Sequence, residues 1–287
     1  MKPRPATPHY HEQREYWDQN LDLRNLSCAS AGEIPDLEKE WAFFMSPEQV
    51  FALQRIGAPA GLRVLEVGGG LGLNALWLAR RGARVTVLDL SGERLRMLAR
   101  LAEREGLRGR LELVQGVAEA LPFRDESFDR EFTKSVLLHV NLDQAAPELR
   151  RVLRNGGKGI FVETMAQNPF VNLYRRFFGP PIWRTIAKYF DEARLREIAR
   201  PFGGARVWTF YFLGFLAFYW QFGNRNLKRF RGWLGLLGKI DGALLSWFPG
   251  LRKRCWFAVV EVEKNYSQDG PGFAALRRGK QDEQDKR

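Results

Sequence analysis

The sequence predicts an α/β protein built on a doubly wound, mostly parallel sheet. From Arg63 onward, short apolar runs alternate with stretches of helical periodicity, which is typical of repeated strand and crossover-helix units. Hydrophobic residues make up 45% of the chain and charged residues 27%, which are ordinary globular proportions. A chain of 287 residues is also long enough to bury a full core.

The apolar runs predict seven strands. In chain order they cover residues 63–67, 84–90, 111–115, 128–133, 158–163, 205–212 and 255–264. Helices are predicted between them, over residues 74–82, 91–106, 143–157 and 191–204. Their apolar side chains recur at three- and four-residue spacings, and Gly82, Gly106 and Gly156 are expected to end the first three helices.

The chain is expected to divide into three parts. Residues 1–44 are predicted to form an N-terminal extension that caps the domain, which itself covers residues 45–264. An aromatic and basic helical insert is predicted at 213–254, between the last two strands, and the polar segment 265–287 is expected to be disordered. The longest apolar run, 207–220, is shorter than the roughly 20 residues that cross a bilayer.

Charge and cysteine content limit the possible partners and cofactors. The net charge of +12 favours an anionic partner, but nucleic acid, anionic lipid and an acidic substrate all fit it. Two cysteines, Cys28 and Cys255, cannot build a disulfide framework or a four-thiolate metal site, which favours a reducing cytoplasm. The histidines, His9, His11 and His139, lack metal-ligand spacing, so no metal is expected.

Glycines gather where the first strand meets the first helix. The run VLEVGGGLGLNAL supplies the candidate cofactor residues Glu66, Gly68, Gly70 and Gly72. Glycine lets the backbone turn sharply and approach a ligand closely, and a helix N-terminus offers unpaired N–H groups. The dinucleotide fingerprint requires a further glycine where Leu73 stands, so the turn predicts a nucleotide-like ligand other than a dinucleotide.

Four further motifs follow this turn in the chain. They are VTVLDLS (85–91), VAEALPFRDESFD (117–129), SVLLHV (135–140) and ELRRVLRNGGKGIFVE (148–163). With VLEVGGGLG (64–72), they resemble the class I S-adenosylmethionine-dependent methyltransferases. The resemblance implies a Rossmann-like sheet of seven strands with an antiparallel final strand, and S-adenosylmethionine as the cofactor.

The resemblance also assigns cofactor contacts to positions of this sequence. It places the glycine turn at the methionine and ribose end, Asp89 at the ribose hydroxyls and Leu90 along the adenine. It places Val117 and Ala118 on the other face of the adenine, and Ser135 beside the methionine portion. Family members often carry Asp where Val117 stands, so adenine recognition is expected to depend on backbone and apolar contacts.

Methyl transfer from a sulfonium is an in-line displacement, which mainly requires an aligned acceptor and the exclusion of water. A hydroxyl or acidic-carbon acceptor also requires a base, and His139 is the first candidate because histidine titrates near neutrality. Glu163, at the end of the fifth strand, is the second candidate. The alternative reading is that His139 only packs or bonds locally. Tyr16 and Trp17 lie on an N-terminal helix that could close over the cofactor.

The sequence narrows the acceptor without identifying it. The position of the Asn/Asp-Pro-Pro-aromatic motif, found in family members that methylate base amines, reads TKSV here, and both cysteines lie far from it. These features disfavour N-methylation and cysteine-dependent C5-methylation of nucleic-acid bases. The insert 213–254 combines Trp, Phe and Leu with eight Lys or Arg and one acid, Asp241, as in helices at membrane interfaces.

We therefore predict O- or C-methylation of a hydrophobic or membrane-associated acceptor such as a lipid, a quinone or a polyketide-like compound. The protein is expected in the cytoplasm, with peripheral contact at the inner face of the membrane through 213–254. Three alternatives stay open: a helical cover with a solvated basic face, an RNA-modifying methyltransferase, and a non-catalytic membrane-associated protein that retains the fold. Nucleic acid is the less favoured partner, and the oligomeric state is left open.

Overall fold

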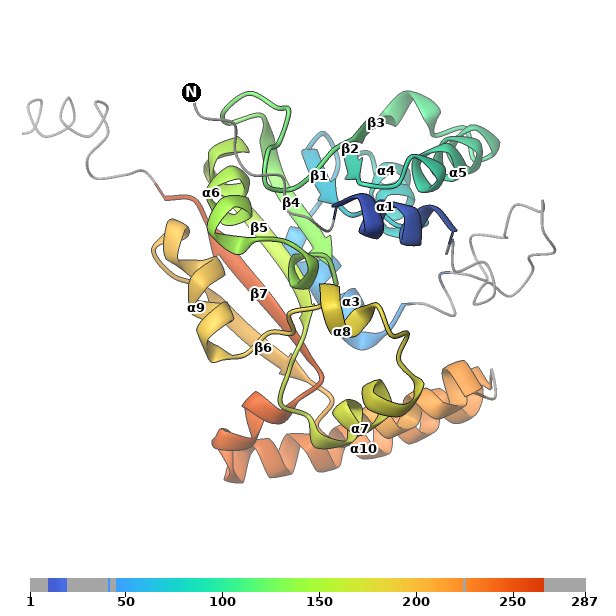
Figure 1. Cartoon of the computed structure of the whole chain (residues 1–287), viewed down its shortest axis with the longest axis vertical. Coiled ribbons are helices and arrows are strands. Elements are labelled where there is room, and N and C mark those ends of the chain that lie inside the picture. Colours follow the sequence, from blue (N-terminus) through green and yellow to red (C-terminus); the bar gives the residue numbers. More distant parts are fainter. Residues whose placement is uncertain (1–9, 20–40, 42–44, 224–225, 266–287) are drawn as a thin grey trace, which may run out of the picture.

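The computed structural model describes residues 10–19, 41, 45–223 and 226–265, and Figure 1 gives the arrangement of their elements. A seven-stranded sheet has the order β3-β2-β1-β4-β5-β7-β6, in which β7 runs antiparallel to both of its neighbours. The strands are β1 Arg63–Val67, β2 Arg84–Asp89, β3 Leu111–Gln115, β4 Phe128–Lys134, β5 Leu153–Thr164, β6 Arg206–Phe210 and β7 Phe257–Glu263. The predicted α/β class, strand number and antiparallel final strand are confirmed.

Helices cover both faces of this sheet. They are α1 Tyr10–Gln19, α3 Pro47–Ile56, α4 Leu73–Arg80, α5 Gly92–Arg104, α6 Leu142–Val152, α7 Pro169–Phe178, α8 Trp183–Ile186, α9 Glu192–Ala199 and α10 Leu227–Trp247. Helices α3, α4 and α5 share one buried cluster with the sheet, and α6 and α9 share the other. The predicted helical insert is present as the short turns η5 Gly214–Ala217 and η6 Tyr219–Gly223, then α10 and η7 Pro249–Arg254.

Strand β1 shows why the sheet is buried on both sides. Val64 faces the cluster that contains α3, α4 and α5, whereas the next residue, Leu65, faces the cluster that contains α6 and α9, and both are fully buried. Successive strand side chains point to opposite faces, and a parallel sheet covered by helices needs apolar residues on each. The apolar runs of the sequence therefore mark the central strands.

The third predicted helix is too long. It was expected over 143–157 with Gly156 as its stop, but α6 ends at Val152 and β5 begins at Leu153. The backbone N–H of Gly156 donates to the carbonyl of Lys264 (2.7 Å), and Lys264 N–H donates to Gly157 (3.0 Å). Gly156 and Gly157 therefore pair with the end of β7. Gly156 has a φ of 72°, which allows an irregularity in the strand there.

The predicted division into an extension at 1–44, a domain at 45–264 and a tail at 265–287 stays a prediction. Residues 1–9, 20–40, 42–44, 224–225 and 266–287 lie outside the described residues. Among the residues that are described, no helix combines the length and apolar character needed to span a membrane.

Candidate active site

A cavity of about 400 Å³ opens at the carboxyl ends of β1, β2 and β4. Open α/β sheets bind their ligands at this edge. Eight of the predicted site residues line the cavity: Gly68, Gly70, Asp89, Leu90, Val117, Ala118, Ser135 and His139. Glu66, Gly72 and Glu163 do not line the cavity. Each lies behind the lining residues and supports them.

The glycine turn after β1 is packed too tightly for side chains. Gly68 has a φ of 72°, and a Cβ there would lie 2.2 Å from Cγ2 of Val136. Gly72 caps α4 at a φ of 74°, where a Cβ would lie 2.2 Å from Cδ1 of Leu98. Only glycine satisfies both the left-handed backbone and the close contact, so the turn can bring bare backbone to the cavity.

Asp89 joins the end of β2 to this turn. Its Oδ2 accepts a hydrogen bond from the N–H of Gly70 (3.0 Å), and its Oδ1 accepts one from the N–H of Ser91 (2.9 Å). Burial raises the pKa of the carboxyl. The carboxylate therefore stands in the cavity wall, where it can also accept from hydroxyl groups of a ligand.

Glu66 lies under the turn and belongs to its support. One carboxylate oxygen accepts a hydrogen bond from Nδ2 of Asn74 (3.1 Å), and Oδ1 of Asn74 accepts from Nε2 of Gln49 (2.5 Å). Burial raises the pKa of Glu66 to about 8. This acid therefore ties β1 to α4 and α3 rather than facing the cavity.

Lys134 is a cavity residue that sequence reasoning missed. It is the last residue of β4, and its ammonium group donates to the side chains of Gln49 and Glu48, the latter at 3.3 Å. Glu48 is buried and also accepts from the hydroxyl of Tyr211 (2.6 Å). Its position in the sequence could have indicated this role, because Lys134 directly precedes the predicted site residue Ser135 at the end of the strand that faces the cavity.

His139 lies in the turn η3 Leu137–His139 at the rim of the cavity. Its Nδ1 is 3.4 Å from the carbonyl oxygen of Ile186, so Nδ1 is the protonated nitrogen and Nε2 is left as an acceptor. Burial lowers the pKa of the imidazole to about 4, in place of the near-neutral titration expected from the sequence. His139 is therefore neutral at pH 7 and a weak base.

Glu163 supports the same turn from below. It is fully buried, and its Oε1 accepts hydrogen bonds from the N–H groups of Val136 (3.2 Å) and Leu137 (3.0 Å). Burial raises its pKa to about 7. The geometry makes Glu163 a positioning residue for the segment that carries His139.

Helix α1 forms a roof over the cavity. Tyr10, Gln13 and Trp17 line it, and the Trp17 ring meets the His139 ring edge-on, with 5.6 Å between centroids. At the end of the helix, Oδ1 of Asp18 accepts a hydrogen bond from the Ser91 hydroxyl (2.6 Å). The expected N-terminal helix thus lies against the site, and Trp17 is the residue that reaches it.

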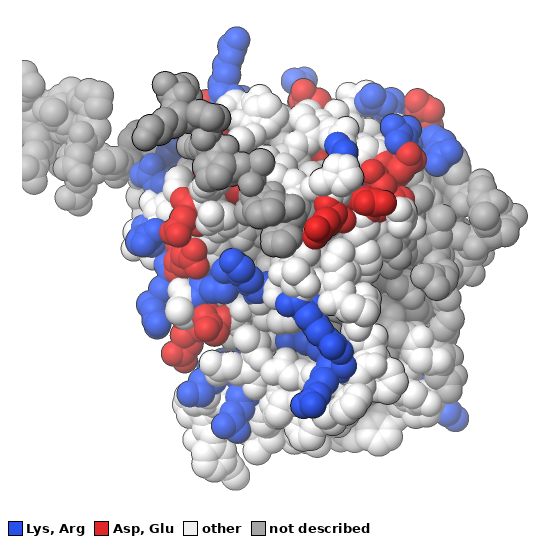
Figure 2. Space-filling view, viewed as in Figure 1, with Lys and Arg blue, Asp and Glu red and all other residues white. Residues whose placement is uncertain are grey.

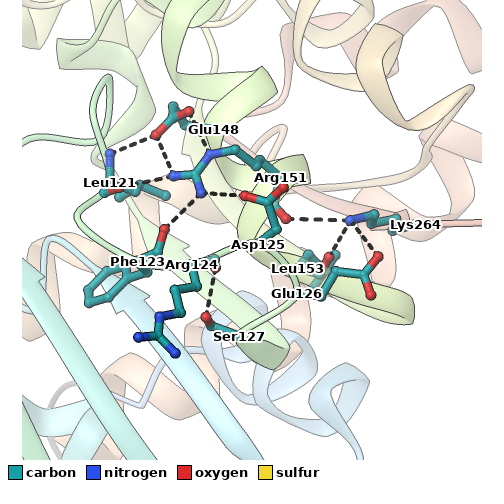
Figure 3. Close-up of polar contacts among 10 residues, drawn as sticks. All are labelled: Leu121, Phe123, Arg124, Asp125, Glu126, Ser127, Glu148, Arg151, Leu153 and Lys264. Carbon is teal, nitrogen blue, oxygen red and sulfur yellow. Dashed lines mark hydrogen bonds and ion pairs between the residues drawn. The ribbon is translucent and has the colours of Figure 1, made fainter.

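A polar clamp fixes the segment that follows the adenine-side residues (Figure 3). The guanidinium of Arg151, on α6, donates to the carbonyl groups of Leu121 (3.0 Å) and Phe123 (2.7 Å). It also pairs with Asp125 and Glu148 at 2.8 Å each. Hydrogen bonds to Glu148 and Asp125 raise its pKa above the ordinary arginine value. One side chain therefore holds the loop that begins at the cavity wall.

No cluster of three His, Cys, Asp or Glu side chains suitable for a metal ion occurs in the described part of the chain. The cavity offers carboxylate, amide, imidazole and ammonium groups together with apolar wall residues. It can hold a polar, nucleoside-like ligand at the glycine turn, beneath α1.

Comparison with known proteins agrees with this geometry. Residues 65–161 match the model of the family described as "Methyltransferase domain". A Streptomyces halstedii protein, Methyltransferase GfsG, is 38% identical over 113 residues, which cover 39% of this chain and 40% of that protein. The Bartonella henselae ubiquinone/menaquinone biosynthesis C-methyltransferase UbiE is 32% identical over 162 residues, which cover 54% of this chain and 55% of that protein.

Solved structures extend the similarity of fold. Geranyl diphosphate C-methyltransferase from Streptomyces coelicolor A3(2) superposes with a TM-score of 0.59 and 16% identity, over 91% of this chain and 100% of that one. The [4+2]-cyclase SpnF superposes with a TM-score of 0.56 and 19% identity, over 92% and 98% of the two chains.

Fold and matched residues together define a class I S-adenosylmethionine-dependent methyltransferase domain. More particularly, the match to the family described as "Methyltransferase domain" covers residues 65–161. The chain spans about half or less of the length of the two curated relatives described above.

Proposed function

We propose that this protein transfers a methyl group from S-adenosylmethionine to oxygen or carbon of a small hydrophobic acceptor. One observation carries the proposal: the glycine turn and Asp89 line the same cavity as α1, Lys134 and His139. The glycine turn and Asp89 suit a nucleoside, and an acceptor would lie beside α1, Lys134 and His139.

The residues present fit the cofactor. Gly68 keeps bare backbone in the cavity wall, because a Cβ there would collide with Val136, and the Asp89 carboxylate suits ribose hydroxyls. Leu90, Val117 and Ala118 supply the apolar walls for adenine, and Ser135 borders the methionine portion. Glu66 and Gly72 support this cradle from behind. When bound, the cofactor supplies an activated methyl group.

The chain itself excludes water and orients the acceptor. The Trp17 roof would shield the reacting centre, because an enclosed site strengthens electrostatic contacts and prevents side reactions. Lys134 places an ammonium group at the same cavity, where it can donate a hydrogen bond to an oxygen of the acceptor beside its pair with Glu48. Neutral His139 can then accept a proton at Nε2, although its low pKa limits its strength as a base.

The relatives support an apolar acceptor. Besides UbiE, the Gibberella zeae sterol 24-C-methyltransferase ERG6B is 36% identical over 109 residues, which cover 37% of this chain and 29% of that protein. The first of these names refers to ubiquinone and menaquinone biosynthesis and the second to sterol methylation, and quinones and sterols are hydrophobic. A cytoplasmic protein in peripheral contact with the inner face of a membrane through 213–254 would reach such acceptors, and this contact forms part of the proposal.

Calorimetry with S-adenosylhomocysteine, the demethylated product, tests the cofactor site. We expect the wild-type protein to bind it and to melt at a higher temperature in its presence. Asp89→Ala should abolish both effects, whereas Asp143→Ala, which removes an exposed carboxylate on α6, should keep them. Absence of heat with the folded wild-type protein would overturn the proposal.

Mass spectrometry of lipid extracts tests the acceptor. Cells that carry the intact gene should contain a metabolite heavier by one methyl group than in cells that carry Asp89→Ala. A methylated product found only in the nucleic-acid fraction would reject the hydrophobic acceptor and keep the methyltransferase.

A further inference from the structure

Exposed hydrophobic side chains gather on one part of the molecule. Among the described residues, they concentrate on α7 and on the insert 213–254, and only Val50 and Val207 lie elsewhere. On α7 they are Phe170, Leu173, Tyr174, Phe177 and Phe178, and in the insert they are Leu216, Tyr219, Phe222, Trp233, Leu236, Ile240, Trp247 and Phe248. Contiguous exposed apolar groups mark interaction surfaces, whereas scattered ones do not.

Helix α7 and the insert form one surface, although 34 residues separate Phe178 from Leu213 in the sequence. Buried Asn168 caps α7, and its Nδ2 donates to the carbonyl of Arg254 (2.9 Å) and to that of Phe212 (3.3 Å). The ring of Phe170 stacks on the ring of Phe215, with 5.7 Å between centroids. Figure 1 shows α7 and α10 together at the lower end of the molecule.

The surface is positively charged. Segments 165–190 and 213–254 contain 12 Lys or Arg residues and one acid, Asp241. Asp241 is buried, and its carboxylate accepts hydrogen bonds from the N–H groups of Phe212 (2.9 Å), Leu213 (2.7 Å) and Gly214 (3.0 Å). In Figure 2 the lowest part of the molecule shows blue and white side chains without red.

We propose that α7 and the insert 213–254 together form a docking surface for an anionic lipid bilayer. The inference rests on the proposed function, whose membrane contact it specifies as an anionic bilayer and to which it adds α7 as half of the contact. Aromatic and aliphatic side chains enter the interfacial region while Lys and Arg contact anionic headgroups, which is the binding mode of interfacial helices.

The same features disfavour two other occupants. A second copy of the chain would bring its own basic residues against this basic surface, and like charges across an interface oppose association. Single-stranded RNA would stack on aromatic rings, but Leu173, Leu236 and Ile240 offer no ring to a base. A bilayer accommodates both the aliphatic and the aromatic side chains.

The docking surface is connected to the active site. After α7, the chain passes through α8 to the rim of the cavity, where Ile186 contacts His139 and the N–H of Lys188 donates to the carbonyl of Leu138 (2.7 Å). A docked molecule would therefore hold the acceptor side of the cavity close to the bilayer, which suits a hydrophobic acceptor.

Vesicle sedimentation tests the surface with the full-length protein. We expect binding to phosphatidylcholine vesicles that contain phosphatidylglycerol, and at least tenfold weaker binding to phosphatidylcholine alone. The double variant Phe177→Ser/Phe178→Ser, with the insert intact, should weaken binding to the anionic vesicles at least tenfold. Arg252→Glu/Lys253→Glu should do the same, and raised salt should weaken wild-type binding. The control Val50→Ser/Val207→Ser removes exposed apolar groups elsewhere and should bind as the wild type does.

Several results would overturn the inference. These are equal binding to both vesicle types, unchanged binding by the α7 variant, or a dimer in sedimentation equilibrium that the α7 variant dissociates while vesicles are not bound. Salt-sensitive RNA retention without vesicle binding would also overturn it. S-adenosylhomocysteine calorimetry on the same samples separates the two proposals. Vesicle binding without cofactor binding rejects only the methyltransferase activity, and the reverse rejects only the docking surface.

Discussion

The two ends of the chain's α/β domain use polar groups in opposite ways. Between β1 and β5, buried acids are bonded to the backbone, Asp89 to the glycine turn and Glu163 to the η3 turn, and the half-buried Arg151 is bonded to the loop at 121–125. From α7 onward, large apolar side chains are exposed, and the acid of the insert, Asp241, points inward. The bonds of the first region keep the ligand cavity in one conformation. The exposed apolar side chains of the second region are suited to contact with an apolar phase.

The largest effect on ligand affinity is expected from a substitution in the glycine turn. Gly68→Ala would place a methyl group 2.2 Å from Val136 and force a left-handed φ on an L-residue, which costs about 1–2 kcal/mol by itself. We expect S-adenosylhomocysteine to bind at least about 100-fold more weakly by calorimetry, a change of roughly 2.7 kcal/mol.

Gly106→Ala is the matched control. Gly106 also has a positive φ, of 66°, but a Cβ there would meet nothing within 4 Å, and the residue lies away from the cavity. This variant should lose some stability and bind the ligand as the wild type does. Equal losses of affinity in both variants would show that glycine is needed to avoid backbone strain, and not because the residue lies close to the ligand.

Removing the clamp around Arg151 should have the next largest effect, on the free energy of unfolding. Arg151→Ala removes bonds to two carboxylates and two carbonyl groups of a loop that starts at the cavity wall. We expect the free energy of unfolding to fall by about 3 kcal/mol in urea titrations. Arg200→Ala breaks an exposed pair with Asp143 and should change it little. Similar losses in the free energy of unfolding for both variants would contradict the view that the region between β1 and β5 is held by its polar bonds.

Much of the first region could be predicted from the sequence because its signals are local. A strand buried on both faces needs an apolar run, as in 63–67, and a turn that brings backbone to a ligand needs glycine, as at Gly68. The cavity lining therefore contains most of the predicted cofactor residues. The prediction that Gly156 ends a helix is wrong because its backbone pairs with Lys264, more than 100 residues later, which no local pattern reveals.

The rest of the site depends on contacts between distant residues. Lys134 joins the cavity through bonds to Gln49 and Glu48 on α3, and α7 joins the insert through Asn168. Neither pairing leaves a spacing in the sequence that distinguishes it from a solvated lysine or an ordinary helix cap. Tertiary structure alone brings these groups together.

The buried acids predict a pH dependence. In the folded protein the pKa of Glu66 is raised to about 8, from an ordinary value of 4.5, so the folded state keeps a proton that the unfolded state releases. Stability should therefore fall as pH rises from about 4.5 to about 8, with a slope of up to ~1.4 kcal/mol per pH unit from this group. Glu66→Gln should remove that contribution to the slope in urea titrations across this range.

Glu163→Gln tests another of these buried acids. Burial raises the pKa of Glu163 to about 7, so Glu163→Gln should also reduce the fall in stability as pH rises above about 4.5. Burial also raises the pKa of Glu131, so each single variant should reduce the slope without removing it completely. A wild-type stability that stays constant from pH 5 to 8 would contradict both assignments.

The smallest effect on stability is expected at the docking surface. Trp247 is 78% exposed at the end of α10, so Trp247→Ser should change the free energy of unfolding by no more than about 0.5 kcal/mol. Phe230, on the buried side of the same helix, is 5% exposed, and Phe230→Ala should cost about 3–5 kcal/mol. If Trp247→Ser destabilised the protein as much, the exposed apolar groups would serve folding, and the reason to assign them to a bilayer would disappear.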